Sequence, residues 1–103
     1  MATQYSESEI LEALKDIIVI ALRKDKSIIQ LESRIFSDLG AESLDVLDIR
    51  FRVEEYFAFK ITDGEVIASL GDNLTPEEID AKFTVKSLLE YVQGRLNEDS
   101  ANN

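Results

Sequence analysis

The chain of 103 residues carries 11 basic and 21 acidic side chains, a formal net charge of −10, and contains neither histidine nor cysteine. Its length fits one domain, and its acidity opposes binding to nucleic-acid phosphates or anionic lipid surfaces. Without histidine and cysteine the chain has no Ser-His-Asp or Cys-His nucleophile system, no disulfide and no thiolate or imidazole metal ligand.

The N-terminal segment contains no recognisable targeting signal. Residues 1–9 lack the basic and apolar regions of a secretory signal. The longest apolar run, residues 17–22, is far shorter than the ~20 residues of a membrane-spanning helix. We therefore predict a cytoplasmic protein without membrane insertion.

A first helix is predicted from residue 6 to about residue 22. Ser6 and Glu9 have the spacing of a capping box, and apolar residues follow at intervals of three and four. Residues 26–40 lack this period, yet they keep spaced apolar residues that predict a long loop anchored to the core. These anchors are Ile28, Leu31, Ile35 and Phe36.

A second helix is predicted over residues 44–57, with Ser43 as its N-cap. This stretch contains neither glycine nor proline and is long enough for about four turns. A helical projection at about 100° per residue separates two apolar arcs. One arc consists of Val46, Ile49, Val53 and Phe57, and the other of Leu44, Leu47 and Phe51. Because a helix in a small bundle buries one face, the second arc either packs beneath a loop or forms an exposed contact patch.

Two further helices are predicted in the C-terminal half. Thr75, Pro76 and Glu78 combine an N-cap, a first-turn proline and a capping-box acid, which predicts a short helix to about residue 81. The rest of residues 62–82 is predicted to be irregular, with a small apolar group around Val66 and Ile67. A last helix is expected over residues 84–96. We predict one all-α domain over residues 1–96 and a disordered polar tail over residues 97–103.

The most informative segment is Asp38-Leu39-Gly40-Ala41-Glu42-Ser43-Leu44-Asp45. It places a hydroxyl at the start of a helix, where free backbone N–H groups and the helix dipole would stabilise a phosphate on Ser43. The segment resembles the motif of the acyl carrier proteins, Asp-Leu-Gly-Ala/Gly-Asp/His-Ser-Leu at the start of the second helix. The order of the predicted helices and the acidic charge agree with this family from the first helix to residue 96, except for residues 64–81.

The resemblance implies a four-helix bundle with one or more extra short helices in an extended loop. It implies a carrier and not an enzyme, with no catalytic residues and no metal site of its own. A phosphopantetheinyl transferase would attach 4′-phosphopantetheine covalently to Ser43, using coenzyme A. The thiol missing from the chain would then arrive with this arm, which would hold acyl chains as thioesters for fatty acid or lipid biosynthesis.

The resemblance also implies roles for the two arcs. Partners such as ketosynthases, dehydratases and acyltransferases, with basic docking surfaces, would meet an apolar and acidic surface on a monomeric carrier. This surface comprises Asp38, Glu42, Leu44, Asp45, Leu47, Asp48, Phe51 and Glu55. A cavity for the acyl chain would be lined by Val46, Ile49, Val53, Ile61, Leu88 and Val92.

Three features depart from the family pattern. Glu42 replaces the usual aspartate, and Arg50 and Arg52 occupy helix positions that are normally small or apolar. We expect Arg50 to form a modest surface pair with Glu54, one turn on. Residues 64–81 form a longer stretch than in housekeeping carriers. These departures resemble specialised bacterial carriers, such as those for long or hydroxylated acyl chains of lipopolysaccharide, and we hypothesise that the stretch enlarges or covers the acyl cavity.

Simpler interpretations remain at this point. Ser43 is a plausible helix cap, the second arc could be ordinary core, and the acids could be a solvated face. Two other functions compete with the acyl carrier. One is a peptidyl or aryl carrier of nonribosomal synthesis, and the other is an unmodified helical adaptor of the same fold.

Overall fold

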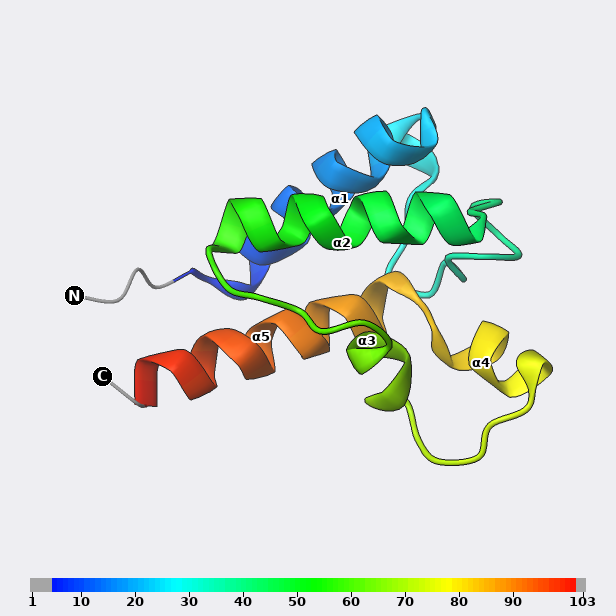
Figure 1. Cartoon of the computed structure of the whole chain (residues 1–103). Helices are drawn as coiled ribbons and strands as arrows, with labels where there is room; N and C mark the ends of the chain where they lie inside the picture. The colour runs from blue at the N-terminus through cyan, green and yellow to red at the C-terminus, as the bar shows by residue number, and fades with distance from the viewer. Residues whose placement is uncertain (1–4, 102–103) are drawn as a thin grey trace.

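Three long helices frame the molecule, and the first of them contacts both of the others (Figure 1). The computed structural model describes residues 5–101, with side chains for residues 5–98. Its elements are α1 (Glu7–Leu22), the 3-10 helix η1 (Lys26–Ile28), α2 (Ser43–Phe57), α3 (Glu65–Ala68), α4 (Pro76–Lys82) and α5 (Val85–Ala101). Across residues 5–101 there is no strand beyond a single isolated bridge between Arg34 and Thr84. The predicted all-α fold with short helices in the second long connection is confirmed.

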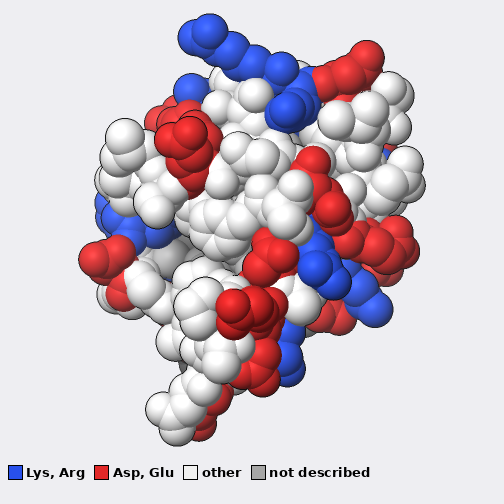
Figure 2. Space-filling view, turned by 90° about the vertical axis from the view of Figure 1, so that its right-hand side faces the viewer, with Lys and Arg blue, Asp and Glu red and all other residues white. Residues whose placement is uncertain are grey.

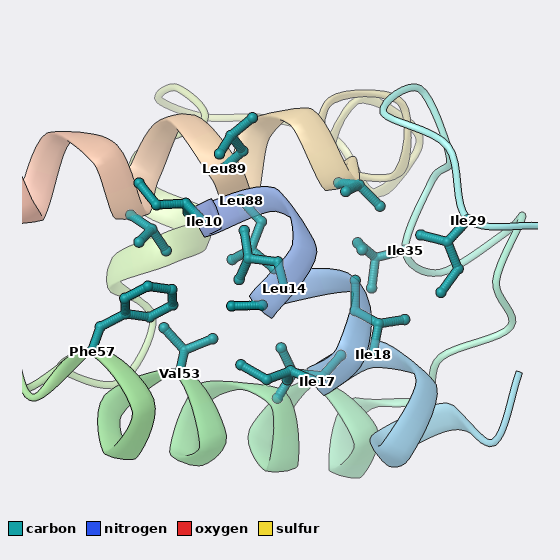
Figure 3. Close-up of a cluster of buried hydrophobic side chains, with 14 of the residues drawn as sticks. Ile10, Leu14, Ile17, Ile18, Ile29, Ile35, Val53, Phe57, Leu88 and Leu89 are labelled. Atoms are coloured by element: carbon teal, nitrogen blue, oxygen red, sulfur yellow. The ribbon is translucent and has the colours of Figure 1, made fainter. Parts of the chain in front are cut away.

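The hydrophobic core lies between α1, α2 and α5. Figure 3 shows Leu14 of α1 between Val53 of α2 and Leu88 of α5. Leu14 and Val53 are fully buried, and Leu88 is 3% exposed. Each such side chain stabilises the fold by about 1.5–3 kcal/mol relative to its exposed state. The buried arc of α2 is therefore the one that we predicted, with Ile49, Val53 and Phe57 in the core.

Two helix starts follow from short sequence patterns. At α1, the Glu9 N–H donates to Ser6 Oγ at 3.1 Å and the Ser6 N–H donates to Glu9 Oε1 at 2.8 Å. At α4, Thr75 and Glu78 make the same reciprocal pair at 3.2 and 2.9 Å. Both capping boxes are confirmed, because each satisfies helix N–H groups within four consecutive residues.

The first long loop is anchored to the start of α5. The Ile35 N–H donates to the Phe83 carbonyl at 2.9 Å, and the Lys86 N–H donates to the Leu31 carbonyl at 2.9 Å. One predicted anchor is wrong, because Ile28 is 51% exposed whereas its neighbour Ile29 is buried. Ile29 anchors the loop in place of Ile28 because the tight 3-10 turn of η1 directs Ile28 outward and Ile29 toward the core.

The predicted end of the last helix is also wrong. α5 continues to Ala101, so residues 97–101 are helical and not a disordered tail, while residues 102–103 lie outside the described part. The apolar stripe ends at Leu96, which is the last residue of α5 that packs against the core. Polar residues without proline can continue a helix into solvent, so the loss of periodicity marked the end of burial and not the end of the helix.

Candidate functional site

Ser43 is the first residue of α2 and its side chain is exposed. The prediction that Ser43 is the N-cap is wrong, because Glu42 takes that position with extended backbone angles. The Glu42 N–H donates to Asp45 Oδ2 at 2.8 Å, so the side chain of Asp45 closes the first turn. The hydroxyl of Ser43 therefore stands outside the cap, at the positive end of the helix dipole.

The loop before α2 holds this serine at the surface. Leu39 and Ala41 are buried, and the Ala41 N–H donates to the Ile35 carbonyl at 3.1 Å. Between them Gly40 has a φ of 73°, a left-handed conformation that glycine adopts without steric cost. Asp38 Oδ2 accepts a hydrogen bond from the Arg34 N–H at 2.8 Å. The Asp-Leu-Gly part of the motif thus shapes the turn that presents Ser43.

An apolar cavity of about 360 Å³ opens beside Ser43. Five of the six predicted pocket residues line it: Val46, Ile49, Val53, Ile61 and Leu88. The sixth, Val92, does not, because it points into the core and is fully buried there. The volume lies within the range of about 300–1,000 Å³ that is common for small-molecule sites.

The cavity is also lined by residues that were not among those predicted to line it, and these include Val66 and Ile67 on α3 and Phe83 just before α5. Their sequence signal is weak, since α3 has only four residues. Thr62 and Glu65 support the start of α3, where the Thr62 hydroxyl donates to Glu65 Oε1 at 2.8 Å. The short apolar group directly after such a pair is the local sequence signal for this wall, and it lies within the 64–81 stretch that we hypothesised to enlarge or cover the cavity.

Glu65 also ties α3 to α5. The hydroxyl of Tyr91 donates a hydrogen bond to Glu65, and Arg95 Nη1 lies 2.8 Å from the same carboxylate oxygen. The hydrogen bond from Tyr91, with further bonds from Thr62, lowers the pKa of Glu65 to about 2. Burial, with the bond to Glu65, raises the pKa of Tyr91 to about 12. The pair is thus a carboxylate and a neutral phenol throughout the physiological pH range.

The second apolar arc of α2 is exposed. Leu44 is 76%, Leu47 37% and Phe51 52% exposed, so the alternative that this arc is ordinary core is wrong. Of the predicted docking acids, Asp38, Glu42 and Glu55 are exposed, while Asp45 and Asp48 are half-buried. Figure 2 shows the end of the molecule where α2 begins, with groups of acidic side chains separated by uncharged surface and, in places, by Lys and Arg side chains.

The two arginines of α2 have different partners. Arg52 Nε lies 3.1 Å from Asp48 Oδ1, one turn back along the helix. The predicted pair of Arg50 with Glu54 is wrong, because Arg50 Nη1 lies 3.4 Å from Asp63 Oδ1. Glu54 instead accepts a hydrogen bond from the Ile61 N–H at 2.7 Å, which fixes the chain as it leaves α2.

The described residues contain neither a membrane-spanning helix nor a group of metal ligands. Among residues 5–101 no helix is long and apolar enough to cross a membrane. Within the same part of the chain, no three acidic residues are grouped as metal ligands would be.

An exposed serine at the start of a helix, beside an apolar cavity in a helical bundle, defines the class of carrier domains with a prosthetic arm. The family model for a phosphopantetheine attachment site matches residues 12–74. The chain is 35% identical over 69 residues to an acyl carrier protein of Campylobacter hominis, covering 65% of this chain and 87% of that protein. It is 38% identical over 65 residues to one from Clostridium acetobutylicum, covering 61% and 84%. The chain belongs to the acyl carrier protein family.

Membership of this family establishes the general role. The protein is an acyl carrier with covalently attached 4′-phosphopantetheine, and it is not an enzyme. It works with a phosphopantetheinyl transferase and with biosynthetic enzymes that use the carried group. The assignment favours the acyl carrier over the peptidyl or aryl carrier and over the unmodified adaptor.

Proposed function

We propose that Ser43 is the attachment point of the arm and that residues 1–96 contain a single carrier domain. The observation that carries this proposal is the position of Ser43, exposed at the start of α2 and on the edge of the cavity. The residues fit the group, because a phosphate at this position meets free N–H groups of the first helical turn. The carrier would present acyl thioesters to cytoplasmic enzymes of fatty acid or lipid biosynthesis, including specialised lipids such as lipopolysaccharide.

Loading requires only a nucleophilic oxygen from this chain. Ser43 Oγ forms a bond to phosphorus, the pyrophosphate bond of coenzyme A breaks, and the adenosine bisphosphate half leaves. The proton of the hydroxyl passes to the transferase, which also supplies the divalent metal. Because Asp45 and not Ser43 closes the first turn, this reaction does not remove the cap of α2.

The cavity would shelter the acyl chain from water. When bound, the arm supplies the thiol that carries the chain as a thioester. Val46, Ile49, Val53, Ile61 and Leu88 would line its path, and burial of each CH₂ group is worth about 0.8 kcal/mol. Val66 and Ile67 of α3 belong to the 64–81 stretch and form part of the wall. Their position supports our proposal that this stretch enlarges the cavity.

The exposed arc would dock partner enzymes. Leu44, Leu47 and Phe51 present apolar surface, and an interface buries such residues at its centre. The acids Asp38, Glu42, Asp45, Asp48 and Glu55 would meet basic groups on ketosynthases, dehydratases and acyltransferases. Charges of this kind accelerate encounter more than they deepen affinity, which suits a monomeric carrier that must be released after each step.

The attachment is tested by intact mass after co-expression with a promiscuous phosphopantetheinyl transferase. We expect one arm on the unaltered chain and none on Ser43→Ala. Ser37→Ala is the matched control, because Ser37 is exposed in the loop before α2. An arm that persists on Ser43→Ala, or no arm on the unaltered chain, would refute the proposal.

A further inference from the structure

The short helix α4 does not belong to the cavity beside Ser43. None of its residues, all of which lie in the described part of the chain, lines that cavity, whereas α3 contributes Val66 and Ile67. α4 instead contacts the loop that precedes α2, and Figure 1 shows it at the end of the molecule where α2 begins. The proposal that the 64–81 stretch enlarges the cavity therefore accounts for α3 and leaves α4 without a role.

One side chain of α4, Asp80, binds this loop. Asp80 Oδ1 accepts a hydrogen bond from the Ser37 N–H at 3.1 Å, and Asp80 Oδ2 lies 3.5 Å from Arg34 Nη1. The contact with Arg34 is long and the arginine side chain is 47% exposed, so this ion pair contributes little. The bond from the Ser37 N–H is the better polar contact between α4 and the loop, because its length is normal and the Asp80 side chain is half-buried.

Apolar packing between α4 and the loop is incomplete. A hollow of about 490 Å³ separates part of the two segments, and it is lined by Phe36, Ser37, Pro76, Ile79 and Asp80. The Phe36 ring packs beyond the end of α4, where its centre lies 5.5 Å from the centre of the Phe83 ring. Because the hollow removes van der Waals contacts between the segments, the hydrogen bond from Ser37 to Asp80 provides a larger share of their attachment.

The loop transmits this constraint to the start of α2. Across the turn, the Gly40 N–H donates to the Phe36 carbonyl at 2.9 Å, next to the bond of the Ala41 N–H described above. Ser37 lies between the two ends of the first bond, and Ser43 follows three residues after Gly40. A contact that holds Ser37 therefore restricts the whole turn that presents Ser43.

We propose that Asp80 is a positioning residue for loading, because it keeps the loop before Ser43 in the conformation that a phosphopantetheinyl transferase binds. The inference rests on the proposed function, since it requires Ser43 to be the attachment point. The transferase reacts with Ser43 Oγ itself, so its surface must cover the loop beside that atom. A loose loop would have to become ordered on binding, which weakens the apparent affinity by the fraction of ordered loop in the free carrier. Once bound, the loop is ordered in either case, so the chemical step keeps its rate.

The test measures arm attachment by intact mass over a series of concentrations of the full chain, with coenzyme A and a promiscuous phosphopantetheinyl transferase. Asp80→Ala removes the acceptor and should raise KM for the carrier about fivefold, the effect of one hydrogen bond, with kcat unchanged. Asp80→Asn keeps an acceptor oxygen for the Ser37 N–H and should stay within about twofold of the unaltered chain. Glu77→Ala removes an exposed acid from the same helix and should leave both constants unchanged.

Amide hydrogen exchange of the same variants shows where the change occurs. In Asp80→Ala, exchange should accelerate more at Ser37 than at Leu89, which lies in the core on α5, because the loop loosens while the bundle stays folded. Glu77→Ala should leave exchange at Ser37 as it is.

Several results would overturn the inference. An equal rise of KM in Asp80→Ala and Asp80→Asn would mean that the charge of this acid contacts the transferase directly. An unchanged KM in Asp80→Ala, a fall in kcat at constant KM, or unchanged exchange at Ser37 would show that Asp80 does not position the loop for binding. Failure of the proposed function gives a different result, because then the unaltered chain takes no arm or Ser43→Ala still takes one.

Discussion

Tyr91 of α5 donates a hydrogen bond to Glu65, the first residue of α3. The two residues are 26 positions apart, and their contact holds the four-residue α3 against the bundle. Val66 and Ile67, which follow Glu65 directly, form part of the cavity wall. The cavity beside Ser43 therefore depends on a hydrogen bond outside its own lining.

Glu65→Gln should destabilise the protein and remove part of its dependence on acid pH. The pKa of Glu65 is about 2 in the folded state and near 4.5 when unperturbed, so the carboxylate stabilises the fold above pH 4.5. This stabilisation is lost as the pH falls from about 4.5 to about 2. Urea unfolding should show a loss of about 1–3 kcal/mol at neutral pH.

The difference between the two proteins should shrink between pH 4.5 and pH 2. Glu77→Gln, an exposed carboxylate on α4, is the matched control and should leave the acid dependence as it is. Parallel pH curves for Glu65→Gln and the unaltered chain would contradict the assigned role of this contact.

Ser43→Ala should change the free energy of unfolding by no more than about 0.5 kcal/mol relative to the unaltered chain, because Ser43 is an exposed first-turn residue and not the cap. Asp45→Ala should cost about 1 kcal/mol, since it removes the acceptor of the Glu42 N–H. Urea unfolding of the two variants provides the comparison. A larger loss of stability for Ser43→Ala than for Asp45→Ala would show that Ser43 is the cap. The loading test would then need Ser43→Thr as a further variant.

Phe51→Ala should affect the docking of partner enzymes, whereas Ile49→Ala should affect the stability of the fold. Phe51 is 52% exposed, so its replacement should change stability by less than about 1 kcal/mol while slowing acyl transfer by a partner ketosynthase. Ile49 is 3% exposed, and its replacement should cost about 2–5 kcal/mol. Thermal unfolding and transfer rates measure the two effects. An unchanged transfer rate for Phe51→Ala would exclude it from the docking surface.

Ile67→Trp should shorten the longest acyl chain that the cavity shelters. The larger ring would occupy space in the cavity wall, so long-chain thioesters should be cleaved by hydroxylamine several-fold faster, while short-chain thioesters stay unaffected. Ile28→Trp is the matched control, because Ile28 is exposed on η1. Equal protection of long chains in both variants would show that α3 does not limit the cavity.

Local patterns allowed much of the fold to be predicted. The capping boxes at Ser6 and Thr75 involve residues only three positions apart, so their hydrogen bonds form within the predicted segments. The two arcs of α2 were recognisable because helical geometry alone separates Ile49 from Phe51. The predicted end of α5 failed because apolar spacing reports burial and not helical conformation.

The features of the candidate site also divide into those that follow from local sequence and those that depend on tertiary contacts. The sequence alone determined the serine at the start of a helix, the turn before it and the acidic surface, because each lies within one short segment. The family resemblance predicted five of the residues that line the cavity, but only the tertiary structure showed that α3 and Phe83 complete its wall. The tertiary structure also placed Val92 in the core and paired Arg50 with Asp63. Such contacts join residues distant in sequence, and packing selects them from many partners that no local pattern distinguishes.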